Sequence, residues 1–367
     1  MFNRIILYLK NFDWIMFASI ILLVCFGLAE IYSVALGRGG ANLINFHKQI
    51  FFVGVGIIFL FTFAFFDYNN WRSFSNSLYI FGAVILVLVL FLGAEARGTR
   101  GWFNFGQFSF QPVELVKFIL IIFLARYFSN VSLKINPFKH LIISGAGVLI
   151  FFILVILQPD FGSALILFLL WLVMIAVAGV RKKYFFIIAL AVAVIGAAGW
   201  AFYLKPYQKE RVMTFLNPSF NPLEQGYNVS QAIIAVGAGG LTGKGIGFGS
   251  QSQLKFLPES QNDFIFAVIA EELGFLGSGL VLLFFAVFFY RCLVNLRKIN
   301  NDFGIFFILG AAGLIFIEMF INISMNIGIL PVVGISLPFL SYGGSSMLVN
   351  LMLVGVIESI VVRSKIK

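Results

Sequence analysis

The stretch Lys205–Asp263, KPYQKERVMTFLNPSFNPLEQGYNVSQAIIAVGAGGLTGKGIGFGSQSQLKFLPESQND, interrupts a sequence that is otherwise strongly apolar. With Leu204 it forms an interval, 204–263, that gathers the prolines, glycines and charges which the flanking segments lack. Its many aromatic residues, Tyr207 and Phe248 among them, and its balanced charge are not typical of a disordered, solvated tail. We therefore predict that 204–263 is a long loop between two membrane spans, and that it forms the lid and wall of an active site.

The composition of the whole chain indicates its class. The 367 residues are 61% hydrophobic and 11% charged, and their mean hydropathy is +1.02. A soluble fold has too little interior to hide so much apolar surface, so we predict a polytopic membrane protein. The net charge of +10 lies largely in short segments at the ends of apolar runs, which indicates membrane topology rather than nucleic-acid binding. Cys25 and Cys292 fall inside apolar runs and imply no disulfide framework.

Apolar runs of roughly 17–25 residues predict an all-α protein with about ten transmembrane helices. We expect one integral membrane domain, 1–367, whose large extracytoplasmic loop, 204–263, joins the seventh and eighth spans. The predicted spans are 14–36, 48–66, 76–93, 112–129, 139–157, 161–180, 184–203, 264–291, 302–328 and 342–362.

The basic residues predict the orientation of these spans. With ten spans, most Lys and Arg at span ends fall on one side, among them Lys10, Lys139, Lys182, Arg291 and Arg363. The positive-inside rule makes that side cytoplasmic, with both termini there. The loop 204–263 then faces outward, and its own basic residues suit an anionic lipid phosphate.

Ionisable groups inside the predicted spans are candidates for function because they are costly to bury. Glu114 and Lys117 stand three residues apart on one helix face, where they can form either a structural ion pair or part of a site. Glu318, Asn322 and Asn326 form a polar stripe, which more often joins helices than performs chemistry.

Two aspartates stand at predicted span ends. Asp160 lies at an outer turn, where it can cap a helix. Asp263 is the last polar residue before the eighth span. It can serve either as a helix N-cap or as a general base whose pKa is raised by partial burial. The residues alone leave both readings open. His47 and His140 lack a third ligand at metal spacing, so we predict no metal site from them.

Several blocks together resemble one family, the SEDS proteins (shape, elongation, division and sporulation), whose members include RodA and FtsW. The resemblance covers essentially the whole chain, including the number of spans. It rests on the blocks Arg100–Phe103 (RGWF), Phe110–Lys117 (FQPVELVK), Gln158–Gly162 (QPDFG), Arg211–Pro218 (RVMTFLNP), Gly226–Gln231 (GYNVSQ), Gly239–Gly245 (GGLTGKG), Phe256–Glu259 (FLPE), Asp263–Gly274 (DFIFAVIAEELG) and Pro338–Ser346 (PFLSYGGSS).

The resemblance implies a peptidoglycan glycosyltransferase that polymerises lipid II into glycan at the outer face of the bacterial cytoplasmic membrane, beside a class B penicillin-binding protein. The family's catalytic aspartate falls on Asp263, its acid–lysine pair on Glu114 and Lys117, and its turn acid on Asp160. Trp102 and Gln111, inside two of the matching blocks, are expected to contact substrate.

One segment and one departure refine this resemblance. The segment 249–259 looks more like RodA than FtsW, which favours a role in cell elongation and shape over division. The family often has Ala-His-Thr before its aspartate, where this chain has Ser260-Gln261-Asn262. An essential histidine base is therefore not expected.

These residues predict a mechanism. Asp263 would take the proton from the acceptor hydroxyl, and direct attack at the anomeric carbon would invert its configuration. Arg211, Lys244 and Lys117 are the candidates to neutralise the leaving diphosphate, with or without a divalent cation such as Mg²⁺ or Mn²⁺. The loop 239–249 is expected to let its backbone approach a phosphate. A lipid II flippase and a non-catalytic scaffold for the penicillin-binding protein are the alternative functions.

Overall fold

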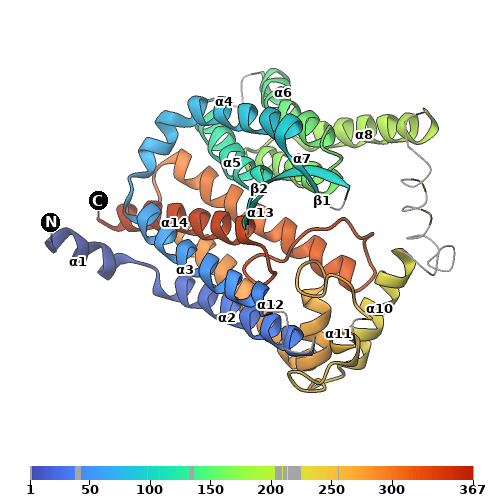
Figure 1. Cartoon of the computed structure of the whole chain (residues 1–367). Helices are drawn as coiled ribbons and strands as arrows, with labels where there is room; N and C mark the ends of the chain where they lie inside the picture. Colours follow the sequence, from blue (N-terminus) through green and yellow to red (C-terminus); the bar gives the residue numbers. More distant parts are fainter. Residues whose placement is uncertain are drawn as a thin grey trace.

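Ten long helices of the computed structural model coincide with the ten predicted spans (Figure 1). The structure describes residues 2–37, 43–96, 98–106, 108–131, 136–202, 209, 213, 225–254 and 256–366. The ten helices are α2 (Trp14–Gly37), α3 (Ile44–Phe65), α4 (Tyr68–Leu92), α5 (Pro112–Asn130), α6 (Pro137–Ile156), α7 (Phe161–Val177), α8 (Lys182–Phe202), α12 (Ile265–Leu296), α13 (Asp302–Asn326) and α14 (Gly344–Ile366).

Length and composition qualify seven of these helices as membrane spans within the described part of the chain: α2, α3, α4, α6, α12, α13 and α14. Of the others, α7 is a shorter apolar helix, and α5 carries Glu114, Lys117 and Arg126 along its length. The chain is thus a multi-pass membrane protein, as the composition predicts.

Outside the 204–263 interval, two parts of the fold are absent from the sequence-based prediction. A short amphipathic helix, α1 (Phe2–Asn11), precedes the first span. Between α4 and α5 the chain forms a small antiparallel sheet of β1 (Ala94–Ala96), β2 (Thr99–Phe105) and β3 (Phe108–Phe110), in the order β1-β2-β3. Ala94 pairs with Trp102, and Phe103 pairs with Phe110. The sheet therefore fixes the position of Trp102 relative to the start of α5.

The centre of the bundle is formed by α5, α13 and α14, which are buried along most of their length. Close helix contacts there depend on small residues. A Cβ on Gly355 of α14 would lie 2.4 Å from the carbonyl oxygen of Leu60 in α3, so only glycine permits this approach.

The described part of the 204–263 interval is ordered around the beginning of α12. It contains α10 (Gln225–Ala238), α11 (Ser250–Gln253) and a glycine-rich segment between them, 239–249. A Cβ on Gly239 would lie 1.8 Å from the carbonyl oxygen of Ala270, and Gly243 has a positive φ of 79° beside Glu272. These glycines let the segment lie directly on the backbone of α12.

The segment also accepts hydrogen bonds from backbone amides that a break in α12 leaves unpaired within the helix. Gly274 has φ 67° and ψ −160°, so the helix is interrupted there. The freed amides of Phe275 and Leu276 donate to the carbonyls of Gly240 and Leu241, at 2.9 and 3.1 Å. Irregular backbone at this depth is tolerated because protein, not lipid, supplies the missing hydrogen bonds.

Candidate active site

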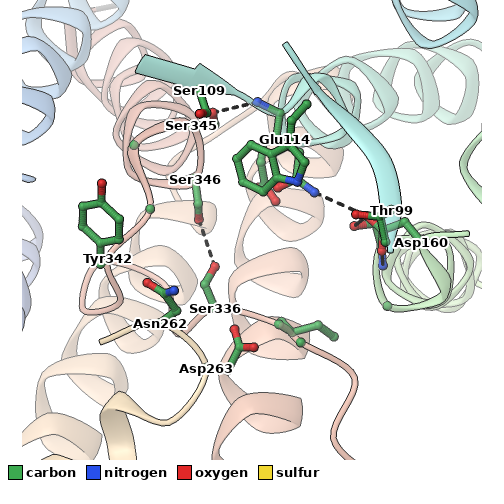
Figure 2. A pocket seen from close by; sticks show the side chains of 18 of the residues that line it. Thr99, Ser109, Glu114, Asp160, Asn262, Asp263, Ser336, Tyr342, Ser345 and Ser346 are labelled. Atoms are coloured by element: carbon green, nitrogen blue, oxygen red, sulfur yellow. Dashed lines mark hydrogen bonds between the residues drawn. The ribbon is translucent and has the colours of Figure 1, made fainter. Parts of the chain in front are cut away.

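A cavity of about 680 Å³ opens among β2 and the first turns of α5 and α7. The segments 332–336 and 342–346, the residue pair Asn262–Asp263 and residues of α3, β3 and α10 also line it. Figure 2 shows Glu114, Asp160 and Asp263 on different sides of this opening. The structure thus brings together six of the predicted site residues, which line this one cavity: Trp102, Gln111, Glu114, Lys117, Asp160 and Asp263.

Hydrogen bonds to its main-chain carbonyl hold Asp263 in place. Its carbonyl oxygen accepts hydrogen bonds from the side-chain amides of Asn322 and Asn326, at 2.9 and 3.0 Å. The N-cap of α12 is Phe264, which makes no side-chain cap hydrogen bond, so Asp263 does not occupy the N-cap position. Gly334 passes close to the carboxylate, since a Cβ there would lie 3.6 Å from Asp263 Oδ2.

The two asparagines of α13 tie Asp263 to its surroundings, and both are fully buried. Asn326 Oδ1 accepts from the amide of Ala267 at 3.1 Å and so binds the first turn of α12. Asn322 also donates to the carbonyl of Ile335 at 2.7 Å, in the segment that lines the cavity. The polar stripe predicted to join helices therefore also positions Asp263.

Lys117 lies in a buried cluster with two acids. Its Nζ is 2.8 Å from Glu114 Oε1 and 2.7 Å from Glu318 Oε1. The side chains of the three residues are 4%, 10% and 2% exposed, so the pairing takes place away from bulk water. The predicted Glu114–Lys117 pair is confirmed, whereas Glu318 was not predicted as a second partner. An ammonium group has three donors, and these contacts use two of them.

Asp160 is the N-cap of α7, as its position predicted, and it also faces the cavity. Its carboxylate accepts from the amide and hydroxyl of Ser163, at 2.9 and 2.7 Å. Gln111 Nε2 donates to the same carboxylate at 3.3 Å, and the backbone amide of Gln111 donates to Ser345 Oγ at 2.9 Å. Gln111 therefore joins the starts of α5, α7 and α14 at the cavity wall.

Of the other two predicted cations, only Lys244 falls among the described residues. Lys244 is not among the cavity-lining residues. It pairs with the buried Glu271 at 3.0 Å and donates to Ser250 at 2.8 Å, within the segment that lies on α12. Arg211 lies outside the described residues. The predicted contacts of both residues with a diphosphate stay predictions.

Several cavity residues were not singled out from the sequence as having a role. Lys48, on the first turns of α3, is a cation that faces the cavity and makes no ion pair within the described ranges. A basic residue at the outer end of a predicted span departs from the positive-inside rule, and this signal was available in the sequence. Polar groups from distant segments also line the cavity: Thr99, Asn262, Ser336, Tyr342 and Ser346.

Residues 13–366 match the profile of a family described as cell cycle protein and named for FtsW, RodA and SpoVE. Stage V sporulation protein E of Bacillus subtilis (strain 168) is 37% identical over 359 residues, which cover 95% of this chain and 96% of the relative. Peptidoglycan glycosyltransferase MrdB of Escherichia coli (strain K12) is 34% identical over 329 residues, covering 89% and 88%. A probable peptidoglycan glycosyltransferase FtsW of Geobacter sp. (strain M18) is 32% identical over 366 residues, covering 97% and 98%.

Solved structures share the fold. A chain from the work "Structural coordination of polymerization and crosslinking by a peptidoglycan synthase complex" superposes with a TM-score of 0.82 at 27% identity, covering 96% of this chain and 98% of that one. The rod shape determining protein RodA of Thermus thermophilus superposes with a TM-score of 0.72 at 24% identity, covering 97% and 98%. From its sequence and its fold, the chain belongs to the family of FtsW, RodA and SpoVE, the SEDS proteins.

Proposed function

We propose that this protein is a peptidoglycan glycosyltransferase that polymerises lipid II, with Asp263 as its general base. The observation that carries the proposal is the placement of Asp263. Two buried asparagines hold its main chain, and the residue lines the same cavity as Lys117, Glu114 and Asp160. Relatives across the matched length are named peptidoglycan glycosyltransferases, which supports the same reaction here.

In the proposed reaction, the Asp263 carboxylate takes the proton of the acceptor sugar's 4-hydroxyl. The acceptor oxygen attacks the anomeric carbon of the donor, and the bond to the diphosphate breaks with its electron pair on the leaving oxygen. Attack opposite the leaving group inverts the anomeric centre. The diphosphate needs positive charge nearby more than it needs a proton. Lys48 and the third N–H of Lys117 supply it from the described cavity wall.

The active site is proposed to face outward from the cytoplasmic membrane, with both termini in the cytoplasm. Gly344–Ser346 line the cavity at the start of α14, and the helix then runs 23 residues to Ile366. At about 1.5 Å per residue this length crosses a bilayer, so Ile366 lies on the opposite face from the cavity. The amino-terminal helix is on the C-terminal side, since Lys365 Nζ donates to the carbonyl of Asn11 at 2.8 Å.

Within the family, we assign the chain to the RodA-like branch that serves elongation and cell shape, with a class B penicillin-binding protein as partner. The assignment rests on the segment 249–259, because the relatives named stage V sporulation protein E, FtsW and MrdB are similarly distant, at 37%, 32% and 34% identity. Expression in cells depleted of RodA or of FtsW tests it. Rescue of the FtsW-depleted cells alone would contradict it.

The direct test is polymerisation of labelled lipid II by the purified full chain, with and without the partner and with Mg²⁺ or Mn²⁺ added or chelated. Wild type should form long glycan and Asp263→Asn none, while both bind the partner equally. Asp302→Asn, which removes an exposed acid at the far end of α13, is the matched control and should polymerise like wild type.

Two outcomes would contradict the proposal. Polymer formed by Asp263→Asn at the wild-type rate would exclude Asp263 as the base. Absence of polymer from wild type under every condition would exclude the glycosyltransferase, and lipid II translocation in vesicles would then separate a flippase from a scaffold.

A further inference from the structure

A second cavity lies at the starts of α6 and α8, away from the proposed active site. We call it the α6–α8 pocket. Its volume is about 550 Å³, and it is lined by Asn136, Pro137, Phe138, Lys139, Ile142, Ile143 and Tyr184. None of these residues lines the active-site cavity. The proposed reaction therefore does not account for this pocket.

One wall of the pocket is apolar and faces outward from the bundle. Phe138, Ile142 and Ile143 of α6 are 54%, 52% and 42% exposed. The helix that carries them is long and apolar enough to cross the membrane. Its first two turns therefore lie where acyl chains meet headgroups, and this wall presents a surface for an acyl chain.

The rim of the pocket is strongly basic. Lys139 lines it, and the exposed residues Arg181, Lys182 and Lys183 immediately precede Tyr184. None of the four makes an ion pair in the described part of the chain. The sequence from 131 to 203 contains one acidic residue, Asp160, which caps α7 far along the chain from the pocket.

Aromatic contacts hold one of these cations beside the pocket. Lys183 Nζ lies 5.0 Å from the centroid of the Tyr184 ring, within the range of a cation–π interaction. The Tyr184 ring in turn stacks on Phe138, with centroids 6.4 Å apart and an interplanar angle of 27°. The apolar wall and the basic rim are thus parts of one surface.

We propose that the α6–α8 pocket binds an anionic phospholipid. The headgroup phosphate contacts Lys139 and the cations that begin α8, and one acyl chain lies on Phe138, Ile142 and Ile143. Basic pockets between membrane helices suit anionic headgroups. The apolar wall selects a lipid over a soluble anion, because a free phosphate would leave that wall uncovered.

Occupancy would bridge two helices that are joined at the pocket by the stacking of Tyr184 on Phe138. Figure 1 shows α8 reaching outward beyond its neighbours, and several side chains in its first half are exposed, with Phe186 at 72% and Leu190 at 57%. A lipid seated between the starts of α6 and α8 would hold α8 against the bundle.

The test is lipid binding to the purified full chain by native mass spectrometry and by thermal shift, comparing phosphatidylglycerol with phosphatidylcholine. Wild type should prefer phosphatidylglycerol. Lys139→Gln/Lys183→Gln should weaken that binding roughly tenfold or more, because each cation near a membrane surface contributes to anionic lipid binding. The matched control is Arg297→Gln/Lys298→Gln, which removes the same charge from exposed residues at the end of α12 and should bind like wild type.

A third variant, Ile142→Gln, tests the acyl-chain wall and should also weaken phosphatidylglycerol binding. Equal losses in the control and the pocket variant would overturn the proposal, since the effect would then be unspecific charge attraction. Equal affinity for phosphatidylcholine would overturn it too. The proposal would also be overturned if glycerol phosphate bound as tightly as the lipid and Ile142→Gln left phosphatidylglycerol binding unchanged, because the ligand would then be a soluble anion.

Discussion

At the scale of single residues, Asn326 contacts both the main chain of Asp263 and the first turn of α12. Its Oδ1 accepts from the amide of Ala267, and its Nδ2 donates to the carbonyl of Asp263. Asn326→Asp keeps the acceptor and replaces the donor with an oxygen that repels the Asp263 carbonyl. We expect kcat to fall by roughly tenfold to a hundredfold, since displacing a catalytic group by ~1 Å costs about that much, while the variant stays folded.

Lipid II polymerisation per folded molecule and thermal melting in detergent measure this effect. Asn295→Ala is the control, because it also removes a buried asparagine, one that donates to Asp13 and lies outside the cavity. It should lower thermal stability and leave kcat unchanged. If Asn326→Asp behaved in the same way, Asn326 would have a structural role only.

Lys117 offers a second test at this scale. Lys117→Met leaves Glu114 and Glu318 buried without their shared cation, and breaking such a pair typically costs ~3–5 kcal/mol of stability. Lys117→Met/Glu318→Gln removes one of the stranded charges and should recover much of the thermal stability. If Lys117 also neutralises the diphosphate, neither variant should recover polymerisation. Recovered activity in the double variant would limit Lys117 to a structural role.

The sequence predicted local relationships between residues better than distant ones. Glu114 and Lys117 were paired by their spacing on one helix, which depends on helix geometry alone. Glu318 joins them only because α13 packs against α5, and no spacing rule contains that information. The same limit applies to the cations. Lys244 was chosen as a site residue because it is close to Asp263 in sequence, whereas Lys48, which lines the cavity, was not chosen because it is far from Asp263 in sequence.

At the scale of elements, the contact between the segment 239–249 and α12 can be tested with two glycines. A Cβ on Gly239 would lie 1.8 Å from the carbonyl of Ala270, so Gly239→Ala must displace the segment from the helix. We expect a loss of ~1–3 kcal/mol in stability and faster proteolysis of 239–254. Gly237→Ala adds the same methyl group to the last turn of α10, into open space, and should be neutral or slightly stabilising.

Among the elements, the spans were predictable and the structures that connect them were not. Apolar length alone places a helix in a bilayer, and the ten predicted ranges match ten helices. The sheet β1–β3 consists of strands as short as three residues, which leave no clear alternating pattern. The break of α12 at Gly274 was not predicted, because the hydrogen bonds that stabilise it come from the segment 239–249, whose contact with α12 depends on the folded structure.

At the scale of the whole molecule, Asp13 connects the amino-terminal end of the chain to α12 and α14. Arg291 Nη2 is 2.8 Å from its carboxylate, Asn295 donates to the same group, and the Asp13 amide donates to Glu358. Burial raises the pKa of Asp13, but the hydrogen bonds from Arg291 and Asn295 outweigh burial, so that pKa lies below its usual range.

A lowered pKa in the folded state means that ionised Asp13 stabilises the fold above the ordinary carboxyl pKa. This stabilisation is lost as the pH falls through the folded-state pKa. Asp13→Asn should therefore reduce the melting temperature most near neutral pH, and its difference from wild type should shrink on acidification. A pH-independent effect of Asp13→Asn would contradict the assignment.

The polar stripe on α13 has a consequence for how this chain can evolve. Glu318 contacts Lys117 on one side of the cavity, and Asn326 holds Asp263 on the other. They are eight residues apart on one helix, which sets their axial separation at about 12 Å. Adding or removing one residue between them would turn the asparagine away from Asp263 by about 100°. If Asp263 is the base, as proposed, the number of residues between 318 and 326 is fixed by the need to keep both contacts.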